Sequence, residues 1–131
     1  MFCFFTDATP VRVWHALTQP GHTRTYLEGM ALRSDWVVGS AIVASFRGEL
    51  TQLGEVLCVQ AHTRLSYVIR PPAASAVYLT WLIRRRVDGC ICSLQIDETE
   101  ASDRPELEDV WLPIMAALQR TIDAVSEQAE S

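Results

Sequence analysis

Three histidines are the side chains of this sequence best suited to act as a general base near neutral pH. His15 and His22 fall in segments that look helical, and His62 falls in a predicted turn. A hydrolase of the serine type needs a histidine paired with a nucleophile and an orienting acid. No histidine has such a partner by spacing, and no Gly-x-Ser-x-Gly motif is present. We therefore expect solvated surface histidines and predict no catalytic residue.

The four cysteines could bind a metal or react as thiolates. Cys3, Cys58, Cys90 and Cys92 lie inside apolar, strand-like runs, without the spacing of a zinc motif or of a secreted disulfide framework. Cys90 and Cys92 are two residues apart and would share one face of a strand. A metal site that joins them to Cys58 and His62 is the minor alternative. We expect buried, reduced thiols that pack as small hydrophobic side chains, with no metal and no organic cofactor.

All eleven basic residues are arginine, and none is lysine. The sequence therefore excludes a Schiff-base or lysine-nucleophile mechanism. The net charge is −5 and no basic stripe is present, so we expect no nucleic-acid partner. Arg84, Arg85 and Arg86 precede the turn Asp88-Gly89, which predicts a solvated hairpin tip, with anion binding as the weaker alternative.

The apolar stretches are too short for a membrane-spanning helix, which requires roughly 18 residues or more. The first ten residues lack the basic segment of a signal peptide. With 131 residues, of which 49% are hydrophobic, the chain is long enough to bury a sizeable core. We expect one domain, residues 1–131, in a cytoplasmic protein without a membrane partner.

The first part of the chain predicts a strand followed by two short helices. Phe2–Thr6 is strand-like, and Thr9 followed by Pro10 is a helix start with a capping residue and a proline at the first helical position. The segment Gln19–Gly21 ends this helix. A second helix is predicted over His22–Leu27, so that the two helices form an insertion between the first two strands.

From Ser34 onward, short β-rich runs are separated by turn residues, which predicts an antiparallel meander. The predicted strands are Trp36–Val38, Ala41–Arg47, Gly54–Gln60, Arg64–Arg70, Val77–Arg86 and Cys90–Asp97.

Over Glu106–Glu127, apolar residues recur at spacings of three and four, which predicts an amphipathic helix about 33 Å long. Pro113 lies inside this pattern, so the regular helix begins near Leu112 or kinks there. One long helix must cover the apolar face of a whole sheet, and the sheet is therefore expected to curl around it. Because a helix is only about 10 Å across, space between the sheet and the helix can stay open as a pocket.

Four segments, in this order, carry a family pattern: Val13–Ile42, Gly54–Pro71, Val77–Ile83, and the positions Trp111, Ile114, Met115 and Leu118. Together they resemble the branch of the SRPBCC (START/polyketide-cyclase) superfamily that is similar to the activator of the heat-shock-protein-90 ATPase. The resemblance implies the α+β helix-grip fold. This fold has a curved antiparallel sheet of six to seven strands around a long C-terminal helix, two short helices between strands one and two, and usually an apolar cavity.

Two positions depart from the family pattern. Gln60-Ala61-His62 stands where relatives commonly have Asp-Pro-Pro, and Ile96 stands where a histidine often ends the last strand. No role of that histidine is carried over to this chain. Co-chaperone activity is not carried over either, because in the family's namesake it also depends on a separate N-terminal domain.

Strand alternation assigns one set of side chains to the inner face of the predicted sheet, and the C-terminal helix adds others. The residues predicted to bind a ligand are Trp36, Phe46, Tyr67, Leu79, Trp81, Cys92, Trp111, Met115 and Leu118. Tyr26 and Glu28 are predicted at the pocket mouth, where burial could shift a pKa and allow acid–base chemistry. For each residue alone, core packing is the stronger interpretation, whereas the set as a whole favours a pocket.

We expect this cavity to bind a small hydrophobic or aromatic molecule without turnover. A cyclase- or hydrolase-like enzyme that uses the same pocket is one alternative. A protein-interaction module, either homodimeric or bound to a chaperone or repressor, is another. Ionisable groups inside the cavity would favour the enzyme, and a collapsed cavity with an exposed apolar patch would favour the interaction module.

Overall fold

The computed structural model describes residues 2–27, 29–70, 76–98 and 111–123. Its elements in chain order are β1 (Phe2–Thr6), α1 (Pro10–Thr18), α2 (Pro20–Tyr26), β2 (Ala31–Arg33), β3 (Ala41–Phe46), β4 (Glu49–Gln60), β5 (Arg64–Ile69), β6 (Val77–Arg86) and β7 (Gly89–Glu98). Residues 111–123 are helical and are called the C-terminal helix below.

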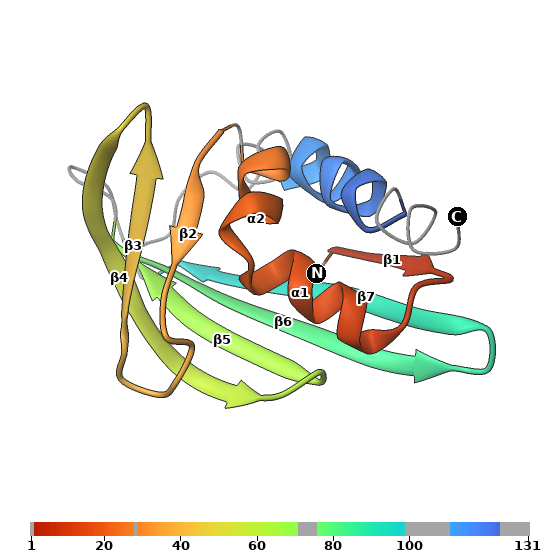
Figure 1. Cartoon of the computed structure of the whole chain (residues 1–131). Helices are drawn as coiled ribbons and strands as arrows, with labels where there is room; N and C mark the ends of the chain where they lie inside the picture. Colours follow the sequence, from red (N-terminus) through yellow and green to blue (C-terminus); the bar gives the residue numbers. More distant parts are fainter. Residues whose placement is uncertain (1, 28, 71–75, 99–110, 124–131) are drawn as a thin grey trace.

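The seven strands form one antiparallel sheet in the order β1-β7-β6-β5-β4-β3-β2. Strands β2 to β7 form a meander, and β1 pairs with the last strand, so β1 and β2 lie at opposite edges. The α1–α2 insertion must therefore cross the sheet to connect them. Figure 1 shows α1, α2 and the C-terminal helix on the concave side of the sheet. The helix-grip fold predicted from the sequence is confirmed.

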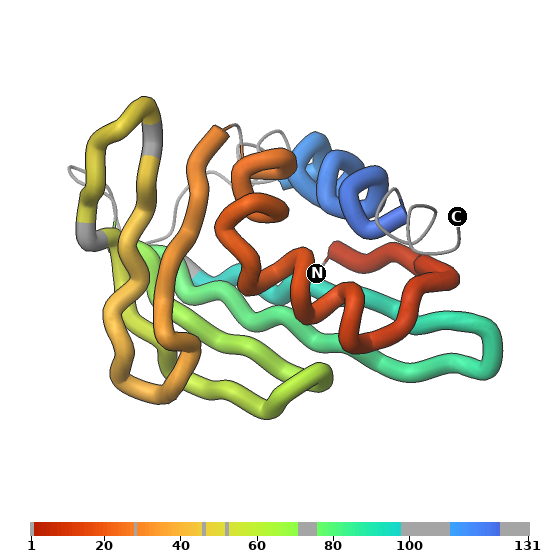
Figure 2. The backbone as a smooth tube through the Cα atoms, in the orientation of Figure 1, coloured from red at the N-terminus to blue at the C-terminus, as the bar shows by residue number. Residues whose placement is uncertain are grey.

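Irregular pairing accompanies the curvature of the sheet. The register between β3 and β4 shifts after Ile42, and that between β4 and β5 shifts after Val56. A Cβ atom at Gly54 would lie 1.8 Å from the carbonyl oxygen of Val68, so only glycine allows this close approach of β4 and β5. Bulges and glycines of this kind bend strands. Figure 2 shows β3 and β4 bending toward the helical side.

A single residue, Gln19, separates the two short helices and caps both of them. The Thr9 side chain accepts a hydrogen bond from the Arg12 amide at 3.3 Å, which caps α1. Gln19 ends α1, where its amide donates to the His15 carbonyl oxygen, and it also precedes α2. The second helix begins at Pro20 rather than at His22, because proline suits the first turn of a helix.

The predicted strand Trp36–Val38 is wrong. The strand before β3 is Ala31–Arg33, and Trp36 lies in the loop after it with a φ of +53°. The Ser34 hydroxyl accepts a hydrogen bond from the Trp36 amide at 3.1 Å and contacts the Ser40 hydroxyl at 3.0 Å. Aromatic and β-branched composition suggested a strand here, but the two serines stabilise a turn.

Strand β4 begins five residues before the predicted position, at Glu49 instead of Gly54. Arg47 and Gly48 both have positive φ angles, +51° and +83°, and join β3 to β4 directly. Two consecutive positive φ angles are typical of a tight type I′ hairpin turn. The sequence Arg-Gly is a weak signal for this turn. The predicted strand before it therefore ends at Arg47, one residue beyond the observed end of β3 at Phe46.

The C-terminal helix is tied to two neighbouring elements. Asp123 accepts a hydrogen bond from the Thr6 hydroxyl at 2.9 Å, and the Gln119 amide group donates to the Phe5 carbonyl oxygen at 3.0 Å. The Thr25 and Thr121 hydroxyls, on α2 and on this helix, are 2.8 Å apart. Both ends predicted for the helix, Glu106 and Glu127, lie outside the described residues.

Buried side chains of the C-terminal helix, of α1 and of the concave face form a single core cluster. The helix contributes Ile114, Met115, Leu118 and Ile122 to it. At the far end of the sheet, the Arg84–Arg86 side chains are exposed beside the β6–β7 turn, as predicted. Within the described ranges, no helix is long and apolar enough to cross a membrane.

Candidate functional site

Tyr67 and Trp81 form the polar centre of the concave face. They are diagonal neighbours on β5 and β6, because Tyr67 is opposite Leu79 in the register. The Trp81 indole Nε1–H donates a hydrogen bond to the Tyr67 hydroxyl oxygen at 3.0 Å. The two side chains are only 1% (Trp81) and 3% (Tyr67) exposed. A tryptophan ring can only donate, so the tyrosine oxygen is the acceptor in this bond.

Trp36, which lies in the loop between β2 and β3, belongs to the same aromatic group. Its ring meets the Tyr67 ring edge-to-face, with centroids 6.0 Å apart and an interplanar angle of 62°. Its Nε1–H donates to the Thr18 carbonyl oxygen, at the end of α1, at 3.0 Å. The half-buried indole is therefore oriented by a helix that arrives from the opposite edge of the sheet.

Tyr26, predicted at the pocket mouth, is only 3% exposed and belongs to the core cluster. Its hydroxyl donates a hydrogen bond to the Ala16 carbonyl oxygen at 3.0 Å. This bond satisfies the hydroxyl hydrogen within the helical insertion. Glu28, the other residue predicted at the mouth, lies outside the described residues.

The ionisable groups of this face are held in their neutral forms. Burial raises the pKa of Tyr26 well above its usual value, and neighbouring Tyr67 and Cys92 raise it further. Burial also raises the pKa of Tyr67 to about 12, although the Trp81 hydrogen bond opposes this shift. Burial, with a smaller effect of Cys90, raises the pKa of Cys92 to about 12. A general base works best with a pKa near the working pH. The raised pKa values of these three groups lie farther above neutral pH than those of ordinary tyrosine and cysteine side chains.

Nearly all residues predicted to bind a ligand are brought together. Leu79, Cys92, Met115 and Leu118 are buried in the core cluster, and half-buried Trp111 packs against it. Phe46 ends β3, and its side chain lies outside the described part of the structure. The shared position of these residues matches the predicted wall, whereas their contact with a ligand stays a prediction.

The cysteines and histidines do not assemble into a reactive centre. All four cysteines are free, with Cys3 exposed and Cys58 half-buried. Among the described residues, no group of three or more His, Cys, Asp or Glu side chains could hold a metal ion. His62, exposed and with a φ of +64°, contacts the Trp14 ring edge-on at a centroid distance of 6.0 Å. No local sequence pattern indicates this contact, because it depends on the packing of α1 over the β4–β5 turn.

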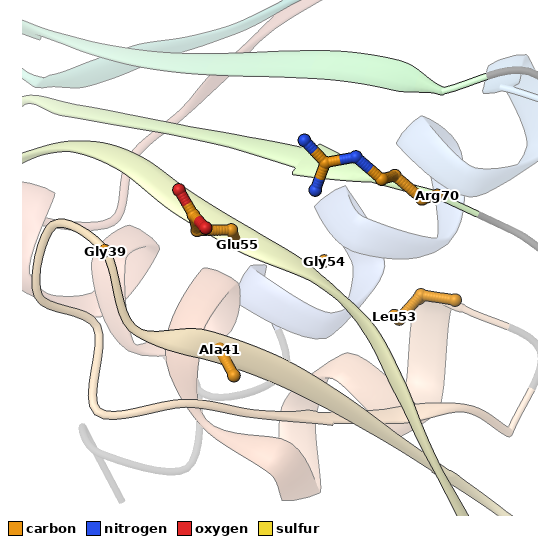
Figure 3. Close-up of a pocket in the computed structure, with 6 residues that line it drawn as sticks. All are labelled: Gly39, Ala41, Leu53, Gly54, Glu55 and Arg70. Atoms are coloured by element: carbon orange, nitrogen blue, oxygen red, sulfur yellow. The ribbon is translucent and has the colours of Figure 1, made fainter.

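A second candidate site lies on the outer face of the sheet. It is an open pocket of about 310 Å³ lined by Gly39, Ala41, Leu53, Gly54, Glu55 and Arg70. Glu55 is opposite Val68 in the register, so Arg70 follows two residues later on the same face. Figure 3 shows both charged side chains over this face. None of the residues predicted to bind a ligand lines it.

The architecture and the enclosed aromatic group define a helix-grip protein with an apolar interior. The family described as Activator of Hsp90 ATPase homolog 1-like protein matches residues 7–123. The chain belongs to this family, within the SRPBCC superfamily. The fold of this family indicates a ligand-binding or interaction domain.

Solved structures share this fold. Protein CV1439 from Chromobacterium violaceum is 19% identical, with a TM-score of 0.72, over 93% of this chain and 94% of that chain. CalU16 from Micromonospora echinospora is 17% identical, with a TM-score of 0.74, over 96% and 76%. A solution structure of the Aha1 dimer from Colwellia psychrerythraea is 12% identical, with a TM-score of 0.75, over 93% of each chain. No curated protein matches in sequence.

Proposed function

We propose that the chain is a single-domain ligand-binding protein that holds a small hydrophobic or aromatic molecule between the concave sheet face and the C-terminal helix. The observation that carries this proposal is the aromatic group Trp36, Tyr67 and Trp81, whose rings are oriented by hydrogen bonds on the helical side of the sheet. Rings fixed in this way offer a flat apolar surface together with a polar handle, which suits a planar ligand.

The chemistry of this face favours binding over turnover. Tyr26, Tyr67 and Cys92 are buried, and their raised pKa values keep them protonated near neutral pH. A cyclase or hydrolase that used them would need a base that can take up a proton. We therefore rank a cyclase- or hydrolase-like enzyme below a binding protein.

A homodimeric interaction module is the second candidate. The similar fold of the Aha1 dimer from Colwellia psychrerythraea supports it. Large apolar side chains are also exposed on this chain, among them Val37, Val38 and Leu50. Sedimentation velocity at rising protein concentration would measure the association: a stable dimer supports this candidate, and a monomer throughout removes it.

Titration of the intrinsic tryptophan fluorescence with a set of planar aromatic compounds tests the main proposal. A saturable spectral change is expected because Trp36 and Trp81 belong to the proposed wall. Trp81→Phe should reduce the change and weaken binding, while Trp14→Phe, on α1 beside His62, is the control and should preserve binding. A folded protein that binds no member of a broad set would contradict the proposal.

A further inference from the structure

Tyr67 carries a hydroxyl hydrogen that no described residue accepts, although its oxygen has a partner. Its oxygen accepts the Trp81 Nε1–H bond at 3.0 Å, and tryptophan cannot accept a hydrogen in return. No acceptor for the Tyr67 hydroxyl hydrogen lies among the residues that the structure describes. The side chain is 3% exposed, so bulk water is not an abundant partner either. A buried donor without an acceptor is costly, and native proteins seldom leave one.

The polar groups around Tyr67 contrast with it. Tyr26 donates its hydroxyl hydrogen to the Ala16 carbonyl oxygen, and Trp36 donates its Nε1–H to the Thr18 carbonyl oxygen. The Thr18 hydroxyl donates to the Trp14 carbonyl oxygen at 2.9 Å. Each of these donors is satisfied within the helical insertion. Tyr67 is the donor of this group whose hydrogen remains available to a bound molecule.

The surroundings restrict the acceptor that could reach this hydrogen. The neighbouring side chains are the rings of Trp36 and Trp81 and the core cluster, whose polar members Tyr26 and Cys92 are neutral. No arginine belongs to the described core cluster around Tyr67, so a carboxylate or phosphate placed here would lose its hydration without a compensating charge from these residues, which is strongly unfavourable. A neutral oxygen avoids that penalty, and a carbonyl oxygen conjugated to an aromatic ring lies in the ring plane.

We propose that Tyr67 donates its hydroxyl hydrogen to a carbonyl oxygen of the ligand, which makes the ligand a neutral planar aromatic carbonyl compound. The inference rests on the proposed function, namely that a ligand occupies the concave face. It adds a chemical class and assigns one residue to its selection. Trp81 acts as a positioning residue, because its indole N–H engages the Tyr67 oxygen and turns the hydroxyl hydrogen away from itself.

A matched pair of probes tests this assignment. 2-Acetylnaphthalene and 2-ethylnaphthalene have nearly the same shape, but only the ketone can accept a hydrogen bond. The wild-type chain should bind the ketone roughly five- to tenfold more tightly, as expected for one neutral hydrogen bond. Tyr67→Phe should abolish this preference and leave the affinity for 2-ethylnaphthalene unchanged. Tyr78→Phe is the matched control, because Tyr78 is exposed and pairs with Val68 on the outer face of the sheet, and it should retain the preference.

The infrared spectrum of the bound ketone provides a second readout. Its carbonyl stretching frequency should be lower in the wild-type complex than in the Tyr67→Phe complex, because a hydrogen bond weakens the carbonyl bond. An equal preference and equal frequencies in the two proteins would overturn the inference while leaving the proposed function in place. Failure of both probes to bind the folded wild-type chain would instead contradict the proposed function, and the inference with it.

Discussion

Thr6 and Asp123, 117 residues apart in the sequence, are joined by a hydrogen bond of 2.9 Å from the threonine hydroxyl to the aspartate Oδ1. The same hydroxyl oxygen accepts a hydrogen bond from the Ala8 amide at 3.2 Å. Thr6 is buried at the end of β1, the edge strand that pairs with β7. The bond therefore fixes the C-terminal helix to the edge of the sheet, and this helix covers the candidate site.

Thr6→Val should lower the free energy of unfolding by about 2 kcal/mol, because it removes a buried hydroxyl that bonds a carboxylate. Urea denaturation of both proteins measures the change. Thr25→Val is the control, since the Thr25–Thr121 pair is exposed, and it should cost about 0.5 kcal/mol or less. Equal losses in the two variants would show that the Thr6–Asp123 bond does not anchor the helix.

Gly54→Ala should destabilise the fold by about 3 kcal/mol or more, since the added methyl group would collide with the Val68 carbonyl oxygen. Gly21→Ala, in helix α2, meets no atom within 4 Å. Alanine favours a helix over glycine, so this second variant should gain up to about 1 kcal/mol. Thermal unfolding distinguishes the two changes, and a neutral Gly54→Ala would refute the close approach of β4 and β5.

The stability of the chain should fall as the pH rises above 9. The Cys92 thiol ionises at a pKa of about 12 in the folded state, against 9.0 for an ordinary thiol. Between these values the unfolded chain binds fewer protons than the folded chain, so the free energy of unfolding decreases by about 1.4 kcal/mol per pH unit for this group. Urea midpoints at pH 7 to 11 measure the slope. Cys92→Ala should make the slope shallower, and an unchanged slope would argue against a buried, neutral thiol.

The cysteines should differ in their reaction with a thiol reagent under native conditions. Cys3 is exposed and should react within minutes, and half-buried Cys58 should follow more slowly. Cys90 and Cys92 are buried and should react only when the chain opens. Mass spectrometry of the labelled peptides measures the order, and early labelling of Cys92 would contradict the closed core.

Elements with a strong local signal were predicted well from the sequence. The strand Val77–Arg86 has the predicted bounds, because alternating apolar residues and a good hairpin turn define it. The aromatic and β-branched residues Trp36–Val38 predict a strand, whereas hydrogen bonds to the Ser34 and Ser40 hydroxyls determine the conformation of this segment. Serine is common in both strands and turns, and its partners become known only from the structure.

The candidate site was predicted as a set of residues but not as a hydrogen-bonded arrangement. Alternation assigned Tyr67 and Trp81 to the inner face, yet their hydrogen bond depends on the register of β5 against β6. The outer pocket depends on register as well, because Glu55 lies on β4 and Arg70 directly follows β5. Register depends on turn geometry and on bulges as well as on the hydrophobic pattern, and the register shifts after Ile42 and Val56 carry no clear sequence signal.

A two-dimensional ¹H–¹⁵N NMR titration of the chain with 2-acetylnaphthalene tests most directly whether a ligand binds between the sheet and the C-terminal helix. The indole N–H signals of Trp36 and Trp81 should shift in a saturable way, together with amides along β5 and β6 on the concave face. Shifts confined to residues around Glu55 and Arg70, or no shifts at ligand saturation, would contradict a binding site between the sheet and the C-terminal helix.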